Sequence, residues 1–222
     1  MEIWCDSADA HVAMSFAREG WLAGITTNPK ILSAQKVMAE EQIAALLDAQ
    51  QGFVAVQVSA SSTEAMLAQA KKLRGLSTRI LVKIPMTPMG IKAIPQLREH
   101  GIPTLATAVF GAEQFLLAAQ MKVDYVAPYL YHMEQQGIPS MEELAMMQEI
   151  KQHYRFTTKI MAASIQDIQI IKKIAKLGID ALTLTPACLN RWMENDYSIT
   201  STKTLNEAWE PFAKDYAGEL FS

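Results

Sequence analysis

RILVKIPMTP, residues 79–88, contains an apolar run from Ile80 to Pro85 with one lysine, Lys83, in its interior. Consecutive apolar residues rich in isoleucine, leucine and valine are typical of a β-strand that is covered on both faces. Such strands belong to parallel sheets with helices packed against them. The stretch therefore predicts a buried parallel strand, and it places a single amine inside that strand.

Seven other short apolar runs occur along the chain, separated by longer segments with the apolar spacing of amphipathic helices. The eight runs span residues 2–5, 23–26, 53–58, 79–85, 103–109, 125–130, 159–164 and 181–186. Eight strand–helix units are what a closed (β/α)8 barrel, or TIM barrel, requires. We predict this α/β fold in preference to an open doubly wound sheet, which usually has fewer strands and a glycine-rich first turn.

The predicted barrel occupies the chain as a single domain, residues 1–222. After the last strand–helix unit, residues 201–218 form another amphipathic segment, with Trp209, Phe212 and Tyr216 on one face. We expect an extra C-terminal helix here, which packs either on this barrel or on a neighbouring copy of the chain.

Composition excludes several classes of function. Half of the 222 residues are hydrophobic and the formal net charge is −3, so the basic excess expected of a nucleic-acid or membrane-surface protein is absent. No run approaches the ~18 apolar residues of a membrane span, and the first residues do not resemble a signal peptide. We expect a cytoplasmic protein. Cys5 and Cys188 lie far apart and suggest buried free thiols, and neither a metal site nor a cofactor motif is predicted.

Polar residues occur near the carboxyl ends of seven of the eight predicted strands. In parallel barrels these ends meet at one rim, where active sites lie. The residues are Asp6, Thr26, Thr27, Asn28, Gln57, Lys83, Thr107, Tyr129 and Ser164. Each has a structural alternative, because Asp6, Thr27 or Asn28 could cap a helix and the others could be packed or internally hydrogen-bonded. Their convergence on one rim favours a functional site.

Lys83 can be interpreted in two ways. It could form a buried structural ion pair, with Asp6 as the most plausible partner. Alternatively, burial lowers the pKa of a lysine, so that free amine is available near neutral pH to attack a carbonyl and form a Schiff base. We favour the nucleophile, because a barrel interior gains little stability from an ion pair that an apolar pair would not supply.

Several motifs resemble those of the transaldolase family. GITTNPKIL (24–32) is similar to its T-T-N-P signature, and LVKIPMTPMGIKAI (81–94) resembles its Schiff-base strand. GIPTLATAVFGAEQ (101–114), YVAPYL (125–130) and KIMAAS (159–164) follow in the family's order. The resemblance covers essentially the whole chain, and it is closest to the small subgroup that includes the bacterial fructose-6-phosphate aldolases.

The resemblance implies a (β/α)8 barrel with metal-free, cofactor-independent class I aldol chemistry on a sugar or sugar phosphate. Lys83 would be the Schiff-base lysine. Asp6 and Asn28, with Thr26 and Thr27 of the same signature, would contact the dihydroxyacetone unit, and Asp6 would also assist proton transfer. Ser164 would lie in the donor or phosphate region. The family also implies a homo-oligomer, a pentamer or decamer, with the C-terminal helix on a neighbour.

Gln57 and Tyr129 bear on which activity of the family is expected. The resemblance implies that transaldolases carry a glutamate at the Gln57 position and tend to have phenylalanine at the Tyr129 position, whereas the aldolase subgroup has glutamine and tyrosine. An amide does not exchange protons near neutrality, but Gln57 could orient a water together with Thr107. Tyr129 would then be the acid–base group. The pair favours the aldolase, with transaldolase as the alternative.

Two positions depart from the family's pattern. Where relatives usually hold the substrate phosphate with an arginine after the sixth strand, this chain has His132, and a second cation is replaced by Gln166. Lys30 could supply a replacement charge. We therefore expect weaker dependence on a substrate phosphate than in typical relatives. The same departures keep open a different class, a non-catalytic sugar-binding or scaffold barrel.

Overall fold

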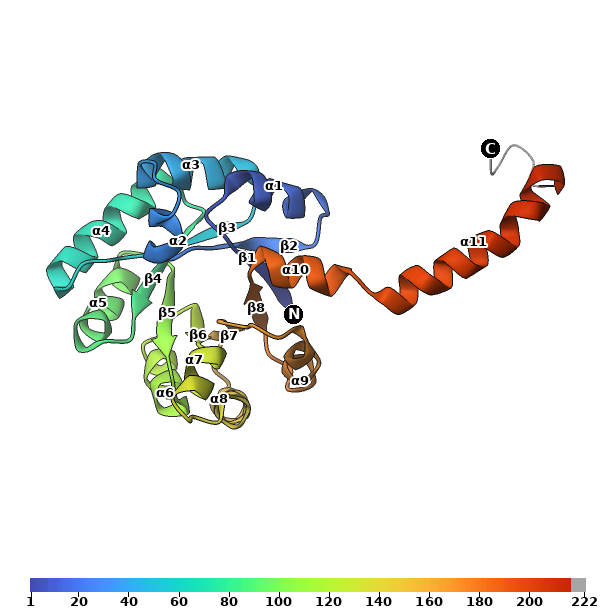
Figure 1. Ribbon diagram of the computed structural model, residues 1–222. Helices are drawn as coiled ribbons and strands as arrows, with labels where there is room; N and C mark the ends of the chain where they lie inside the picture. Colours follow the sequence, from blue (N-terminus) through green and yellow to red (C-terminus); the bar gives the residue numbers. More distant parts are fainter. Residues whose placement is uncertain (217–222) are drawn as a thin grey trace. The chain divides into compact units, whose positions relative to one another are not determined.

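The computed structural model describes residues 1–216 and shows eight parallel strands that form a closed barrel (Figure 1). The strands pair in sequence order, and β1 also pairs with β8 to close the ring. They are β1 (Glu2–Asp6), β2 (Leu22–Thr26), β3 (Phe53–Gln57), β4 (Ile80–Pro85), β5 (Thr104–Val109), β6 (Tyr125–Pro128), β7 (Lys159–Ala162) and β8 (Ala181–Leu184). The predicted (β/α)8 fold is confirmed.

Helices connect the strands and lie outside the ring (Figure 1). Within the barrel unit they are α1 (Ala10–Arg18), α2 (Pro29–Ser33), α3 (Ala39–Ala49), α4 (Thr63–Leu76), α5 (Pro88–Glu99), α6 (Ala112–Gln120), α7 (Leu130–Gln135), α8 (Ser140–Tyr154), the short 3₁₀-helix η1 (Ile168–Ile170) and α9 (Ile171–Lys176). The Ser62 hydroxyl accepts from Ala65 N–H and caps α4.

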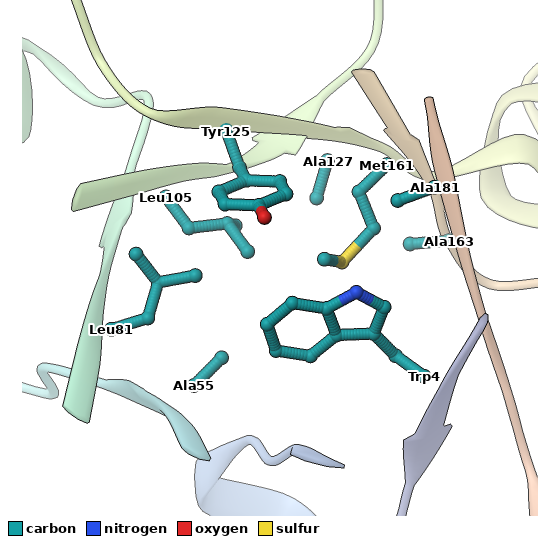
Figure 2. Packing of buried hydrophobic residues seen from close by; sticks show 9 residues of the cluster. All are labelled: Trp4, Ala55, Leu81, Leu105, Tyr125, Ala127, Met161, Ala163 and Ala181. Carbon is teal, nitrogen blue, oxygen red and sulfur yellow. The ribbon is translucent and has the colours of Figure 1, made fainter. Parts of the chain in front are cut away.

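The interior of the barrel is an apolar cluster built from alternate positions of the strands. Figure 2 shows these side chains pointing toward one another, with the Trp4 indole at the centre of the view. The cluster comprises Trp4, Ala55, Leu81, Leu105, Tyr125, Ala127, Met161, Ala163 and Ala181. Gly24 on β2 leaves room for the indole, since a Cβ there would lie 2.7 Å from the ring.

Polar side chains follow this cluster at the next inward position of several strands. Because side chains alternate with period two, a residue two positions after a cluster member points into the barrel closer to the carboxyl rim. The pairs are Trp4 and Asp6 on β1, Ala55 and Gln57 on β3, Leu81 and Lys83 on β4, and Leu105 and Thr107 on β5. The apolar cluster therefore lies directly beneath the polar residues of the carboxyl rim.

A polar network closes the opposite end of the barrel. The Glu2 carboxylate pairs with Lys159 and accepts hydrogen bonds from the Tyr125 hydroxyl (2.9 Å) and the Trp4 indole (3.1 Å). Burial tends to raise the pKa of Glu2, but the hydrogen bonds from Lys159, Tyr125 and Trp4 outweigh it and lower that pKa. The network satisfies the polar atoms of two large aromatic residues while their rings fill the interior.

The chain divides into two units, Met1–Cys188 and one that begins at Leu189. The helix α10 (Pro186–Met193) runs across this boundary, and the second unit contains α11 (Asp196–Tyr216). The predicted C-terminal helix is therefore present and starts earlier than residue 201, while residues 217 and 218 of the predicted range lie outside the described residues. That it packs on a neighbouring subunit, and that residues 1–222 form one domain, stay predictions.

None of the helices in the described part of the chain is both long and apolar enough to cross a membrane.

Candidate active site

A cavity of about 350 Å³ opens at the carboxyl ends of the strands. It brings together most of the residues that the sequence places at this rim. Those that line it are Asp6, Thr26, Asn28, Lys83, Tyr129, His132 and Ser164. Thr27, Gln57 and Thr107 do not line it.

Lys83 lies in the wall of the cavity with only 5% of its surface exposed. Its Nζ donates a hydrogen bond to the backbone carbonyl of Thr27 at 2.7 Å. The ion pairs found among the described residues are Lys151–Asp180, Lys159–Glu2 and Lys203–Glu207, so Lys83 is in none of them. Burial lowers the pKa of Lys83, and the charge of Asp6 opposes this shift only in part. The structural pair with Asp6 that the sequence left open is not formed.

Asp6 is held by hydroxyl groups from two neighbouring strands. Thr26 Oγ1 on β2 donates to Asp6 Oδ1 at 2.7 Å, and the same oxygen lies 2.6 Å from Thr183 Oγ1 on β8. Since the single Thr26 proton is given to the carboxylate, Thr183 must be the donor in the second bond. The alternative that Asp6 caps the next helix is wrong, because Asp9 caps α1.

Tyr129 and Thr107 form a hydrogen bond of 2.7 Å between their hydroxyl groups at the end of β5 and β6. The pairing of these strands shifts in register between Ala106 and Val109, and Ala108 has a positive φ of 56°. Such an irregularity re-aims the side chains around it. Burial raises the pKa of Tyr129, and the Asp6 charge adds to the effect, so the phenol stays protonated and can donate.

Asn28 caps a helix and also lines the cavity. Its Oδ1 accepts from Ile31 N–H at 3.1 Å and caps α2 at Pro29, while the residue also lines the cavity. This cap leaves the amide nitrogen of Asn28 as a donor for a ligand. Thr27 is instead fully buried, and its hydroxyl donates to the carbonyl of Ala55. Thr27 contributes to the site through its backbone carbonyl, which accepts the hydrogen bond from Lys83 Nζ.

Ser164 and His132 meet at the mouth of the cavity. The Ser164 hydroxyl lies 2.8 Å from His132 Nδ1, and the imidazole is 5.6 Å from the Tyr129 ring. Ser164 has a positive φ of 56°, which a residue with a side chain seldom adopts. Strained backbone of this kind concentrates at functional sites, where the surroundings hold it in place. The hydrogen bond from Tyr131 N–H to Ser164 O (3.0 Å) is one such restraint.

Gln57 lies beside Lys83 in the register of β3 and β4. It is partly buried at the carboxyl end of its strand but is not among the residues that line the cavity. Its predicted role in orienting a water with Thr107 therefore stays a prediction.

Two residues of the cavity wall, one on the last strand and one directly after it, were not singled out by sequence reasoning. Thr183 and Thr185 both line the cavity. Thr183 occupies an inward position two residues after Ala181, which belongs to the apolar cluster. It is a polar residue inside the run ALTLTP, and that signal could have completed the rim on the eighth strand.

The two cysteines are buried free thiols, as predicted. Burial raises the pKa of Cys5 to about 12, with a smaller contribution from the charge of Asp6. A thiol that stays protonated is a poor nucleophile. Although Cys5 precedes Asp6, it is therefore not suited to the chemistry of the cavity.

Sequence comparison identifies the class of protein to which this barrel belongs. Residues 3–219 match the family described as transaldolase/fructose-6-phosphate aldolase, and the chain belongs to that family. The resemblance found in its motifs is thereby confirmed, and the protein is an enzyme of the transaldolase family.

Several curated relatives match over nearly their full length. Proteins named probable transaldolase from Caulobacter sp. (strain K31) and Petrotoga mobilis are each 31% identical to this chain, over 98% and 97% of it and 97% of each relative. One from Nitrosopumilus maritimus is 30% identical over 95% of both chains.

Solved structures of other enzymes share the barrel. A mandelate oxidase with a monooxide FMN adduct superposes with a TM-score of 0.60 at 13% identity, covering 83% of this chain and 63% of that one. A flavocytochrome b2 with bound sulfite gives a TM-score of 0.60 at 14% identity, over 83% and 56%. This chain spans less than two thirds of either structure. At such low identity the likeness establishes the fold alone.

Proposed function

We propose that the protein is a class I aldolase that makes or breaks the bond between dihydroxyacetone and an aldehyde, such as glyceraldehyde 3-phosphate. The observation that carries this proposal is the Lys83 amine, which is buried at the cavity wall, outside any ion pair among the described residues, and has a lowered pKa. A neutral amine in such a place is suited to attack a ketone.

In the proposed reaction the neutral Lys83 Nζ attacks the carbonyl carbon of a ketose and forms a carbinolamine. The carbinolamine takes up one proton from solvent and loses one water, which gives an iminium ion. The hydroxyl groups of the donor would then contact Asp6, which Thr26 orients, and the Asn28 amide. Because Asp6 is held at 2.7 Å by Thr26, it can bind the donor without reorganising.

Cleavage follows from the positive charge of the iminium. The C4 hydroxyl passes its proton to the Tyr129 oxygen as the Tyr129 hydroxyl gives its own proton to a solvent water. The C3–C4 bond breaks, and its electron pair moves toward nitrogen. An aldehyde leaves, and an enamine of dihydroxyacetone remains on Lys83. Protonation at C3 and hydrolysis then release dihydroxyacetone and the free amine. The protonated Tyr129 phenol, fixed by Thr107, is suited to return the proton.

Transaldolase activity is the second candidate, and it is favoured by the names of the curated relatives. It differs only in the last stage, when a second aldehyde instead of a proton captures the enamine. Against it stands the Gln57 and Tyr129 pair, which resembles the aldolase subgroup. The two activities separate in one assay, because only the aldolase accumulates free dihydroxyacetone from fructose 6-phosphate when no acceptor is added.

Borohydride trapping tests the proposal directly. The protein is incubated with dihydroxyacetone or fructose 6-phosphate, reduced with sodium borohydride, and its intact mass and peptide map are measured. We expect a stable adduct on Lys83, which is absent from Lys83→Met. Lys159→Met is the matched control, since Lys159 belongs to the polar network at the opposite end of the barrel, and it should still form the adduct. Absence of an adduct with either donor would favour the non-catalytic alternative.

A further inference from the structure

A second cavity, of about 280 Å³, adjoins the first one at the barrel mouth. The two cavities share Ser164, Ile165 and Gln166 in their linings, so these residues are their common wall. The second cavity, which we call the side recess, lies between α7, the start of α8 and the segment that continues into η1 and α9.

The side recess is apolar inside and acidic at its edge. Leu130 and Ile165 in its lining are almost fully buried, with 2% and 3% of their surfaces exposed, and Ile170 adds a third aliphatic side chain. The acidic and basic side chains of its lining are two carboxylates and one ammonium group. They are Glu134, Asp167 and Lys173.

The carboxylates of the edge are fixed by local hydrogen bonds. Glu134 Oε1 accepts from the Ser140 hydroxyl and from Ser140 N–H, and these bonds lower the pKa of Glu134. Asp167 Oδ1 accepts from Gln169 N–H at 3.0 Å. The edge therefore carries a net negative charge, which disfavours a phosphate there and leaves the aliphatic interior for an uncharged group.

A substrate attached to Lys83 lies in the first cavity, whose lining includes both Lys83 and the common wall. Lys83 sits on a strand just above the apolar cluster, whereas Ser164, Ile165 and Gln166 follow the end of β7 at the mouth. An acceptor that extends from Lys83 toward the mouth on the β7 side therefore approaches the common wall. The side recess lies on the other side of these three residues.

We propose that the side recess is a binding subsite for the distal end of acceptor aldehydes that carry an uncharged apolar substituent, such as a phenyl ring. This inference rests on the proposed aldolase function and adds a class of substrate to it. Burial of the substituent's apolar surface against Leu130, Ile165 and Ile170 strengthens the binding of such acceptors.

Paired acceptors test the subsite. Propanal and 3-phenylpropanal differ only by the phenyl ring, and the formation of their aldol products with dihydroxyacetone is measured by liquid chromatography. We expect kcat/KM for 3-phenylpropanal to exceed that for propanal by about tenfold or more, as burial of a ring in an apolar site predicts. Equal values for the two aldehydes in the wild-type protein would overturn the proposal.

A variant that fills the side recess tests whether the preference for 3-phenylpropanal arises there. Gln169 is exposed and lines the side recess, so Gln169→Trp fills this space without disturbing buried residues. We expect it to lower kcat/KM for 3-phenylpropanal at least about tenfold more than for propanal. Lys172→Trp is the matched control, because Lys172 is exposed on α9 and does not line the side recess. It should preserve the ratio of the two efficiencies.

The outcomes separate the subsite from the reaction. An advantage of the phenyl acceptor that survives Gln169→Trp, or that Lys172→Trp also abolishes, contradicts the subsite while the aldolase proposal stands. If neither aldehyde gives product and no Lys83 adduct forms with dihydroxyacetone, the aldolase proposal fails, and the subsite fails with it.

Discussion

The hydroxyl groups of Thr26 and Thr183 lie 2.6 Å apart, although 157 positions separate the two residues in the sequence. The contact exists because β1 pairs with both β2 and β8, so that residues from the second and last strands flank Asp6. Thr183 donates to Thr26, which donates to Asp6, and the chain of bonds therefore holds the Asp6 carboxylate in a fixed orientation.

Thr183 should act as a positioning residue for Asp6. Thr183→Val keeps the shape but removes the donor to Thr26, and we expect kcat for cleavage of fructose 6-phosphate to fall by about 3- to 10-fold, the equivalent of one hydrogen bond. Thr183→Ser, which retains the hydroxyl, should recover most of the rate. If Val and Ser variants are equally impaired, packing and not hydrogen bonding is responsible.

Tyr129→Phe should remove most of the cleavage activity. The change deletes the proposed proton carrier and leaves its ring in place, so we expect kcat to fall by about 10²- to 10⁴-fold. Adduct formation on Lys83, measured by borohydride trapping with dihydroxyacetone, should survive because it does not require cleavage. Thr107→Val, which removes only the 2.7 Å bond that orients the phenol, should have a much smaller effect.

Retention of full kcat by Tyr129→Phe would contradict this assignment of the acid–base group. Loss of the adduct together with the rate would point instead to a general disturbance of the cavity.

Lys83→Met should stabilise the protein, most strongly at lower pH. The pKa of Lys83 is lowered in the folded state from an ordinary value near 10.5, so between the two values the unfolded chain binds one more proton. The folded protein therefore loses stability as pH falls through that window, and a methionine has no such loss. We expect Tm at pH 7 to rise by at least about 2 °C, the shift that roughly 1 kcal/mol gives in a chain of this size.

Thermal unfolding of both proteins between pH 6 and pH 10 measures this difference, which should shrink toward the upper end of the range. A gain in Tm that is independent of pH would show that the amine is not the source of the instability.

Gly24→Ala should destabilise the barrel. The new Cβ would lie 2.5 Å from the carbonyl oxygen of Phe53 and 2.7 Å from the Trp4 ring, and the cost of such overpacking is typically about 1–3 kcal/mol. The control is Gly75→Ala, because Gly75 lies in α4 with nothing within 4 Å of its Cβ position. It should be neutral or stabilising by up to about 1 kcal/mol. Urea unfolding gives both values, and equal effects would contradict the steric argument.

The sequence was sufficient to predict the barrel because its strands are buried on both faces and their apolar runs stand out. The eight predicted runs overlap the eight strands, with differences of one to two residues at the ends. The polar rim was also predictable, since a polar residue late in a buried parallel strand must lie near the carboxyl end of the barrel. The sequence could not predict which rim residues line the cavity, because this depends on strand register and local backbone conformation.

Thr107 and Thr27 illustrate that limit. Both follow the pattern of rim residues, yet Thr107 is directed to the Tyr129 hydroxyl by the irregular pairing of β5 and β6, and Thr27 is directed to a backbone carbonyl. Asp6 shows the reverse, because its contact with Thr26 and Thr183 depends on closure of the ring. The side recess depends on the packing of loops and short helices, for which a sequence carries little periodic signal.

The barrel is closed at the end opposite the cavity, and this determines how substrates enter and products leave. With Trp4 and Tyr125 tied to Glu2 beneath the cavity, a sugar reaches Lys83 from above, and whatever is cut from it must depart along the same route. Donor and acceptor then compete for the same opening of the cavity, and an aldehyde that binds first prevents the ketone from reaching Lys83. For the proposed aldol addition, high aldehyde concentrations should consequently slow turnover, and more dihydroxyacetone should relieve the block.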